Sequence, residues 1–151
     1  MMRINKLTDY GIVVMTEMAA ERSNKINTAR EISESTNIPL PTVTRLLKTL
    51  SSEGLLDSQR GSQGGYSLAK SSDAISIASI LETFEGTISR TECSANSCEC
   101  SYESNCSVEE PWQKINDTVK NALESISLNE MAGNSKSKNL IGLSISYGGQ
   151  T

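Results

Sequence analysis

The amino-acid sequence predicts a mainly α-helical fold with one small β-hairpin. Apolar residues recur at the three- and four-residue spacing of amphipathic helices in several segments. A glycine-rich turn, Arg60 to Gly65, separates two short segments of β type. Between two of the helical segments, Asn37-Ile38-Pro39 interrupts the pattern, because a residue before proline disfavours the helical conformation.

Helices are expected, in chain order, over residues 7–21, 28–36, 41–52, 76–84 and 109–126. Thr8 is the expected cap of the first helix, and Ser127 is expected to cap a short turn after the last one. Pro41 suits the first turn of the third helix, because the N–H that proline lacks would have no helical partner there. That helix is expected to bury one apolar face, made of Val43, Leu46, Leu47 and Leu50.

Two short helices joined by a tight turn and followed by a hairpin, Leu55 to Leu68, predict a winged helix-turn-helix. The second helix of such a pair enters the major groove with its N-terminal residues against base edges. Arginine is the commonest guanine reader, and threonine can meet a thymine methyl. The residues that would face DNA are Pro41, Thr42, Thr44, Arg45 and Lys48. The alternative is that this polar face is only the solvated side of a surface helix.

The hairpin would be the wing of this motif. Its glycine-rich tip, with Gly61, Gly64 and Gly65, would let the backbone come close to DNA. Arg60 beside the tip could hold a phosphate or enter the minor groove. Taken alone, Arg60 would be an ordinary solvated charge.

The charge distribution permits double-stranded DNA as a partner. Residues 1–72 hold 9 Lys and Arg against 7 Asp and Glu, a net charge of +2. Residues 73–151 hold 5 against 11, a net charge of −6, so the acidity of the chain lies in its second half. A symmetric dimer would double the positive charge on one face.

Size and composition favour a small domain with an oligomerisation arm. The chain has 151 residues, and its apolar share of 36% is below the usual globular value, so a large core is not expected. The first residues lack a long apolar segment, so we expect no secretory signal, and no apolar run is long enough for a bilayer. We therefore expect a cytoplasmic protein without a membrane partner.

The domain boundaries follow from these patterns. Residues 1–88 are expected to form the DNA-binding domain, 89–107 a cysteine-rich loop, 108–131 a dimerisation helix and 132–151 a disordered tail. The long helix carries one apolar stripe, made of Trp112, Ile115, Val119, Ala122 and Ile126. Such a stripe is a dimer surface or ordinary core.

All four cysteines of the chain lie in one short segment, spaced C-x4-C-x-C-x5-C, at Cys93, Cys98, Cys100 and Cys106. Four thiolates within reach of one point suggest a metal ion or an iron–sulfur cluster. Structural zinc is the alternative, although one residue between two cysteines is tighter than is usual for zinc. A redox enzyme using Cys98 and Cys100 is disfavoured, because no general base, phosphate loop or cofactor motif accompanies them. We expect neither an enzyme nor a small-molecule substrate.

Several segments together resemble the bacterial winged-helix regulators of the IscR and NsrR type, and most of all those that control Suf-type cluster assembly. They are LTDYGIVVMTEMA, AREISESTNIPLPTVTRLLKTLSSEGLLDSQRGSQGGYSLAK, and the cysteine loop that leads into WQKIN. The resemblance implies a homodimer that pairs through the long helix and binds palindromic operators. It also implies an iron–sulfur cluster, of the 2Fe-2S type ahead of 4Fe-4S.

The ligands that the resemblance implies are Cys93, Cys100 and Cys106, with Cys98 as an additional thiol. In the family a fourth ligand is often a histidine or an acidic residue of the partner's first helix. This chain has no histidine, which leaves Asp9 or Cys98. Asp9 has an ordinary alternative, since an acidic residue in the first turn complements the helix dipole.

The expected function is therefore a transcriptional regulator, in the first place a repressor, of iron–sulfur cluster assembly genes. Cluster occupancy would report iron, redox or cluster status. Two alternatives remain: a nitric-oxide- or redox-responsive regulator of the same family, and a zinc-stabilised DNA-binding protein without a sensor.

Overall fold

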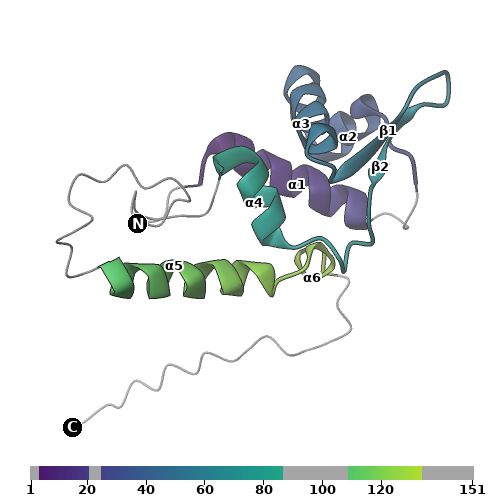
Figure 1. Cartoon of the computed structure of the whole chain (residues 1–151). Helices are drawn as coiled ribbons and strands as arrows, with labels where there is room; N and C mark the ends of the chain where they lie inside the picture. Colours follow the sequence, from purple (N-terminus) through teal and green to yellow (C-terminus); the bar gives the residue numbers. More distant parts are fainter. Residues whose placement is uncertain (1–3, 21–24, 87–108, 134–151) are drawn as a thin grey trace, which may run out of the picture.

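The computed structural model describes residues 4–20, 25–86 and 109–133. In this part of the chain the fold is mainly helical with one antiparallel hairpin, as the sequence predicts (Figure 1). The elements are α1 Lys6–Ala20, α2 Ala29–Thr36, α3 Leu40–Ser52, β1 Leu56–Gln59, β2 Gly65–Leu68, α4 Ile77–Glu85, α5 Glu109–Glu124 and α6 Leu128–Met131. The expected tail falls almost wholly on residues 134–151, outside the described residues.

The start of α1 corrects one expectation from the sequence. Thr8 does not cap this helix, because α1 begins two residues earlier, at Lys6. The side-chain oxygen of Asn5 accepts a hydrogen bond from the N–H of Leu7 at 3.2 Å and takes the capping place. Thr8 is instead fully buried, and its hydroxyl donates to a carboxylate oxygen of Glu85 at the end of α4.

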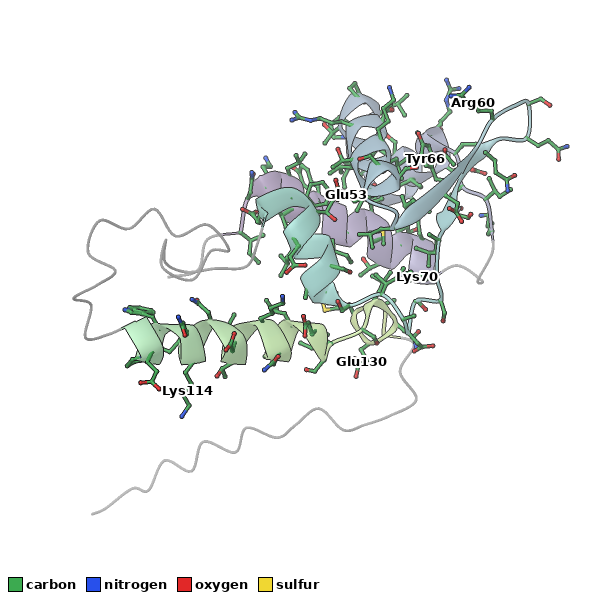
Figure 2. The ribbon with its side chains drawn as sticks, in the orientation of Figure 1. Glu53, Arg60, Tyr66, Lys70, Lys114 and Glu130 are labelled. Atoms are coloured by element: carbon green, nitrogen blue, oxygen red, sulfur yellow. The ribbon has the colours of Figure 1, made fainter. Side chains whose placement is uncertain are left out.

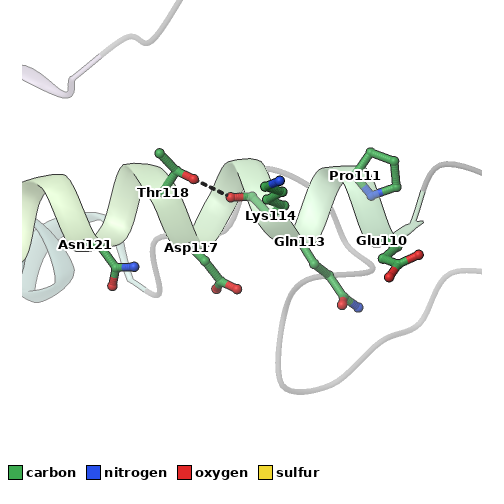
Figure 3. A pocket seen from close by; sticks show the side chains of 7 residues that line it. All are labelled: Glu110, Pro111, Gln113, Lys114, Asp117, Thr118 and Asn121. Atoms are coloured by element: carbon green, nitrogen blue, oxygen red, sulfur yellow. Dashed lines mark hydrogen bonds between the residues drawn. The ribbon is translucent and has the colours of Figure 1, made fainter.

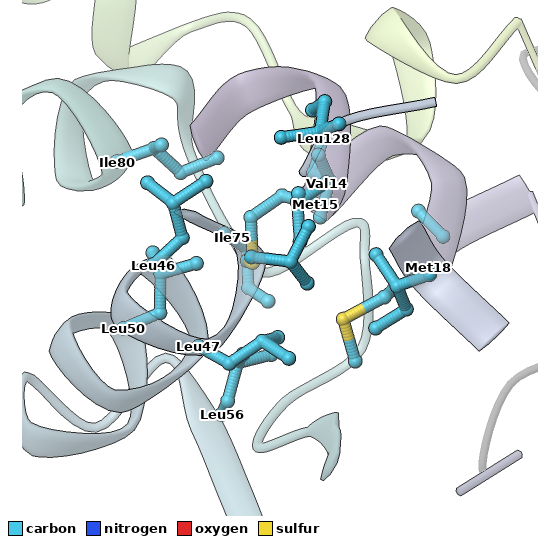
Figure 4. Close-up of a cluster of buried hydrophobic side chains, with 14 of the residues drawn as sticks. Val14, Met15, Met18, Leu46, Leu47, Leu50, Leu56, Ile75, Ile80 and Leu128 are labelled. Carbon is cyan, nitrogen blue, oxygen red and sulfur yellow. The ribbon is translucent and has the colours of Figure 1, made fainter. Parts of the chain in front are cut away.

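One hydrophobic core joins α1, α2, α3, α4, α6 and the base of the hairpin (Figure 4). Its fully buried centre includes Val14, Met15, Leu46, Leu47, Leu50, Ile80 and Leu128. Gly11 of α1 is part of this packing, since a Cβ at that position would lie 2.4 Å from a ring carbon of Phe84 on α4. A side chain at this position would therefore force the Phe84 ring to shift.

The short helix α6 belongs to this core although it follows α5 in the chain. The strand-like pair Ser76 and Ser127 holds it, with the N–H of Leu128 donating to the carbonyl of Ile75 at 2.8 Å. Ser127 caps α6 as expected, and Glu130 completes a capping box with it. The C-terminal helices are thereby fixed to the winged part of the same chain.

The long helix α5 lies beside α4 and extends beyond it (Figure 1). Near its C-terminal end Leu123 packs against the core. The residues of the predicted apolar stripe are much more open. On α5, Trp112 is 40% exposed and Ile115 46%, and Ile126, which lies two residues beyond the end of this helix, is 39% exposed. In the described part of the chain, most of the stripe is therefore exposed.

Candidate nucleic-acid interface

The turn between α2 and α3 is fixed by local hydrogen bonds. Thr28 and Glu31 form a capping box at the start of α2, and their hydrogen bonds hold the pKa of the Glu31 carboxyl below its usual value. Asn37 ends α2 in the left-handed conformation, with φ at 57°, which asparagine tolerates better than most residues. The hydroxyl of Ser33 then donates to the carbonyl of Ile38 at 2.7 Å. The Asn37 conformation and the Ser33–Ile38 hydrogen bond thus shape the turn from which α3 begins.

Helix α3 has the two faces that the sequence predicts. Val43, Leu46, Leu47 and Leu50 are completely buried. Of the residues predicted to face DNA, Pro41, Arg45 and Lys48 are exposed and Thr42 and Thr44 half-buried. Pro41 lies in the first turn, as expected, although the helix begins one residue before it. The structure thus leaves the predicted reading surface open to a partner.

Thr44 uses its hydroxyl hydrogen inside the helix. Its Oγ1 donates to the carbonyl oxygen of Leu40 at 2.9 Å. A hydroxyl engaged in this way keeps acceptor lone pairs but has no hydrogen to offer a base. Of the residues predicted to face DNA, Arg45, Lys48 and the hydroxyl of Thr42 therefore remain as side-chain donors.

The hairpin that forms the predicted wing pairs β1 with β2 from Leu56 opposite Leu68 to Gln59 opposite Gly65. Arg60 is exposed directly after β1, and Figure 2 places it toward the outer end of the hairpin. In that view α3 and Arg60 both lie on the upper side of the molecule.

The three glycines of the tip have roles within the hairpin itself. Gly61 has φ at +115°, a conformation that side chains rarely adopt. A Cβ on Gly64 would lie 2.3 Å from the carbonyl oxygen of Gln59, and one on Gly65 would lie 2.6 Å from that of Asn27. The latter two are therefore required by close backbone packing, whether or not DNA comes near.

The base of the wing has a contact that the sequence does not predict. Asn27 and Tyr66 exchange two backbone hydrogen bonds of 2.8 Å each, which add a strand-like residue to the edge of β2. Asn27 is only 5% exposed, although it ends the polar run Arg22 to Asn27, which the sequence alone predicts to be a linker. The single apolar residue Ile26 is the one weak signal in that run.

A second polar cluster joins the start of α1 to the end of α4. Glu85 accepts from the hydroxyl of Thr8 and, at 2.9 Å, from the backbone N–H of Asn5. The Thr8 hydroxyl, and after it the Asn5 N–H, hold the pKa of the Glu85 carboxyl below its usual value. Asp9, the predicted acidic ligand, is exposed in the first turn of α1 close to this cluster in sequence.

The four predicted thiol ligands, Cys93, Cys98, Cys100 and Cys106, lie outside the described residues. Their segment leaves the described chain just after α4 and re-enters it at the first residue of α5. Among the residues that are described, no three histidine, cysteine or acidic side chains gather where they could hold a metal ion. The structure thus places Asp9 but not the thiols.

An open hollow of about 600 Å³ follows the polar flank of α5 (Figure 3). Its described lining belongs to this helix alone and includes Glu110, Lys114 and Asp117. The Thr118 hydroxyl that faces it already donates to the carbonyl of Lys114 at 2.7 Å. A lining from a single helix does not enclose a ligand, so we assign it no binding role.

The sequence matches known regulators over most of its length. The Rrf2 family, described as iron-dependent transcriptional regulators, matches residues 4–134. The HTH-type transcriptional regulator CymR of Bacillus subtilis is 30% identical over 131 residues, which cover 87% of this chain and 90% of CymR. The regulator IscR of Erwinia tasmaniensis is 26% identical over 133 residues, which cover 88% of this chain and 80% of IscR.

Solved structures agree with these matches. The structure of CymR, the global cysteine regulator of B. subtilis, aligns with a TM-score of 0.69 at 28% identity and covers 89% of this chain and 99% of its own. IscR of T. potens aligns with a TM-score of 0.66 at 23% identity over 88% of each chain, a likeness of fold alone. In the described part of the chain, no helix combines the length and apolar character needed to cross a bilayer.

Proposed function

The chain belongs to the Rrf2 family of iron-dependent transcriptional regulators, and we propose that a cysteine-ligated iron–sulfur cluster controls its affinity for operator DNA. Its relatives are transcriptional regulators, so it is a DNA-binding regulator and not an enzyme. The family and the fold explain the winged half. The cluster, the operator contacts and the dimer are the finer parts of the proposal.

For DNA contact, the support is the geometry of α3 and the wing. Helix α3 would enter the major groove, with Thr42, Thr44 and Arg45 toward base edges and Lys48 toward a phosphate. Pro41 would start that surface. Arg60 would contact the adjacent backbone or minor groove, carried by the tip that Gly61, Gly64 and Gly65 shape.

For a homodimer, the support is the open stripe on α5. Trp112, Ile115 and Ile126 are 39–46% exposed, and aromatic and large apolar side chains are the usual centre of protein interfaces. A second copy that packs its own α5 against this stripe would bury the apolar stripes of both copies. It would also present two α3 helices to the two halves of a palindromic operator.

The observation that carries the cluster proposal is the placement of all four cysteines in one segment between α4 and α5. Thiolates are the ordinary ligands of iron–sulfur clusters, so the donor set fits one. Cys93, Cys100 and Cys106 would hold it, with Cys98 or the exposed Asp9 of a partner copy as the fourth ligand. When bound, the cluster supplies a redox-sensitive group; 2Fe-2S is our preference over 4Fe-4S.

The genes that we propose as targets are those of iron–sulfur cluster assembly, repressed or released according to cluster occupancy. A response to nitric oxide or redox state through the same cluster is the nearest alternative. Zinc in the thiol site, without sensing, is the other, because four thiolates also suit tetrahedral zinc.

Control of cysteine metabolism is a second candidate function. Its support is the 30% identity to CymR, whose structure is described as that of a global cysteine regulator. On this alternative the operators would lie upstream of genes for sulfur metabolism. The thiol segment would then not need a cluster for DNA binding.

The cluster is tested by purifying the full chain without oxygen and measuring its visible spectrum, iron, sulfide and zinc on one sample. We expect absorption near 400 nm with equal amounts of iron and sulfide. Cys93→Ala should lose the absorption, the iron and the sulfide, and the neighbouring Ser94→Ala should keep all three. A colourless protein with stoichiometric zinc would contradict the sensor. The loaded and cluster-free forms should then differ in operator affinity, and equal affinity would contradict cluster control.

The DNA surface is tested by Arg45→Ala, with Lys114→Ala on α5 as the control that removes the same charge elsewhere. If Arg45 reads a base, its removal should cost about 1–3 kcal/mol of specific binding and relax the preference at one position. An equal loss on all sequences would make it a phosphate contact. Lys114→Ala should leave the preference unchanged.

A further inference from the structure

Leu40, the first residue of α3, has an exposed apolar side chain. It is 39% exposed, while Ile38 just before it and Val43 just after it are buried in the core. The other large exposed apolar residues of the described chain are Ile4, Val13, Trp112, Ile115, Ile126 and Met131. None of these lies in α2, α3 or the hairpin, so Leu40 is the one such residue on the surface that would face DNA.

The neighbours of Leu40 make this end of α3 poor in hydrogen-bond donors. Pro41 is exposed and has no N–H. Thr44, one turn on, donates its hydroxyl hydrogen to the carbonyl of Leu40. The N–H groups of Thr42 and Val43 donate to the carbonyl of Pro39 at 2.9 and 3.1 Å. The first turn therefore offers mainly carbon atoms and acceptors, with the hydroxyl of Thr42 as its side-chain donor, and Arg45 and Lys48 bring the positive charge only later.

One base has a feature that suits such a surface. In the major groove thymine alone presents a methyl group, and apolar side chains read it by contact. The residues at the start of a recognition helix are the ones that reach base edges. We infer that Leu40, flanked by Pro41 and Thr44, contacts the C5-methyl group of a thymine in each half of the operator. This specificity rests on the DNA-binding role proposed for α3.

The methyl group can be removed without changing base pairing, by replacing thymine with deoxyuridine. The full chain is first used to select its operator from random duplexes. Each thymine of that operator is then replaced singly, and affinity is measured by fluorescence anisotropy. At one symmetric position we expect about a fourfold loss per replaced methyl, the equivalent of one buried methylene group, and about 15-fold when both halves are changed.

The variant Leu40→Ala identifies the residue that reads the methyl. It should bind thymine and uracil duplexes equally, near the affinity of the unaltered chain for uracil. Val13→Ala trims a side chain of equal exposure, 39%, on α1, and should keep the full preference for thymine. Because the result is a ratio of two affinities, a small change in folding or dimerisation cancels.

The outcomes separate this inference from the proposed function. If no duplex is selected at all, DNA binding by α3 itself is refuted. If an operator is bound but no uracil replacement weakens binding, only the methyl contact is refuted. The same holds if Leu40→Ala keeps the preference for thymine.

Discussion

Helices α3 and α5 are both amphipathic and of similar length, 13 and 16 residues, but their apolar faces end up in opposite surroundings. In α3, Leu46 and Leu47 are completely buried by the same chain. In α5, Trp112 and Ile115 remain 40% and 46% exposed. The winged half is therefore complete within one chain, whereas α5 carries apolar surface that we assign to a second copy.

The largest expected effect is on the buried face. Leu46→Ala removes methyl groups from a site without exposure, and should lower the free energy of unfolding by about 2–5 kcal/mol through lost burial and a cavity. The side chain of Ile115 is nearly half exposed in one chain. Ile115→Ala should therefore change the free energy of unfolding of the monomer by about 0.5 kcal/mol or less. Urea unfolding of both variants at low protein concentration measures the two losses of unfolding free energy. Losses of similar size would contradict the difference between the two helices.

A charge placed in the exposed apolar stripe of α5 should weaken dimerisation. Ile115→Glu places a carboxylate in the proposed dimer surface, and should raise the dimer dissociation constant by about 30-fold or more, the effect of losing an interface centre worth about 2 kcal/mol. Asn121→Glu introduces the same group on the polar flank of α5 and should leave dimerisation unchanged. Sedimentation velocity distinguishes the two; equal behaviour would mean that this stripe is not the contact.

The capping boxes of α2 and α6 allow the contribution of one hydrogen bond to be compared at two places in the fold. Thr28 and Ser127 each accept from the N–H three residues on, at 3.2 Å. Thr28→Ala and Ser127→Ala should each cost about 1 kcal/mol of unfolding free energy, because both helices belong to one core. Thr28→Ser keeps the acceptor and should restore most of the loss. If Ser127→Ala had no effect on global unfolding, α6 would be separable from the winged half.

The smallest expected effect is on acid stability at the α1–α4 junction. The pKa of Glu85 is lowered by the Thr8 hydroxyl and then by the Asn5 N–H, so its stabilising contribution is present above the ordinary value of 4.5 and is lost as pH falls through the lower folded value. Thr8→Val should therefore flatten the decline of stability below pH 4.5, while Thr8→Ser should preserve it. Because Glu85 is exposed, water screens the contact and the difference is small.

The sequence predicts the features that depend on local pattern. The two faces of α3 follow from the spacing of Leu46, Leu47 and Leu50, and the position of Ser127 follows from its capping preference. The order of helices, turn and hairpin is confirmed for the same reason. Each of these signals lies within a few residues of the structure that it predicts.

Features made by distant residues could not be predicted in this way. Thr8 looks like a cap, but Glu85, 77 residues later, takes its hydroxyl into the α1–α4 contact. Asn27 looks like linker, but Tyr66 pairs with its backbone. The glycines of the tip suggest room for DNA, whereas Gly65 is required by the packing of Asn27 against β2. Such contacts are set by tertiary packing rather than by local preference.

The molar mass of the full chain in solution tests the division between the two halves most directly. Sedimentation equilibrium over a micromolar concentration range, without DNA, should give twice the monomer mass of 16.3 kDa. Ile115→Glu should return the value toward one monomer with the winged half still folded. A mass of one monomer for the unaltered chain at every concentration would contradict the account, because the exposed stripe of α5 would then have no second copy to cover it.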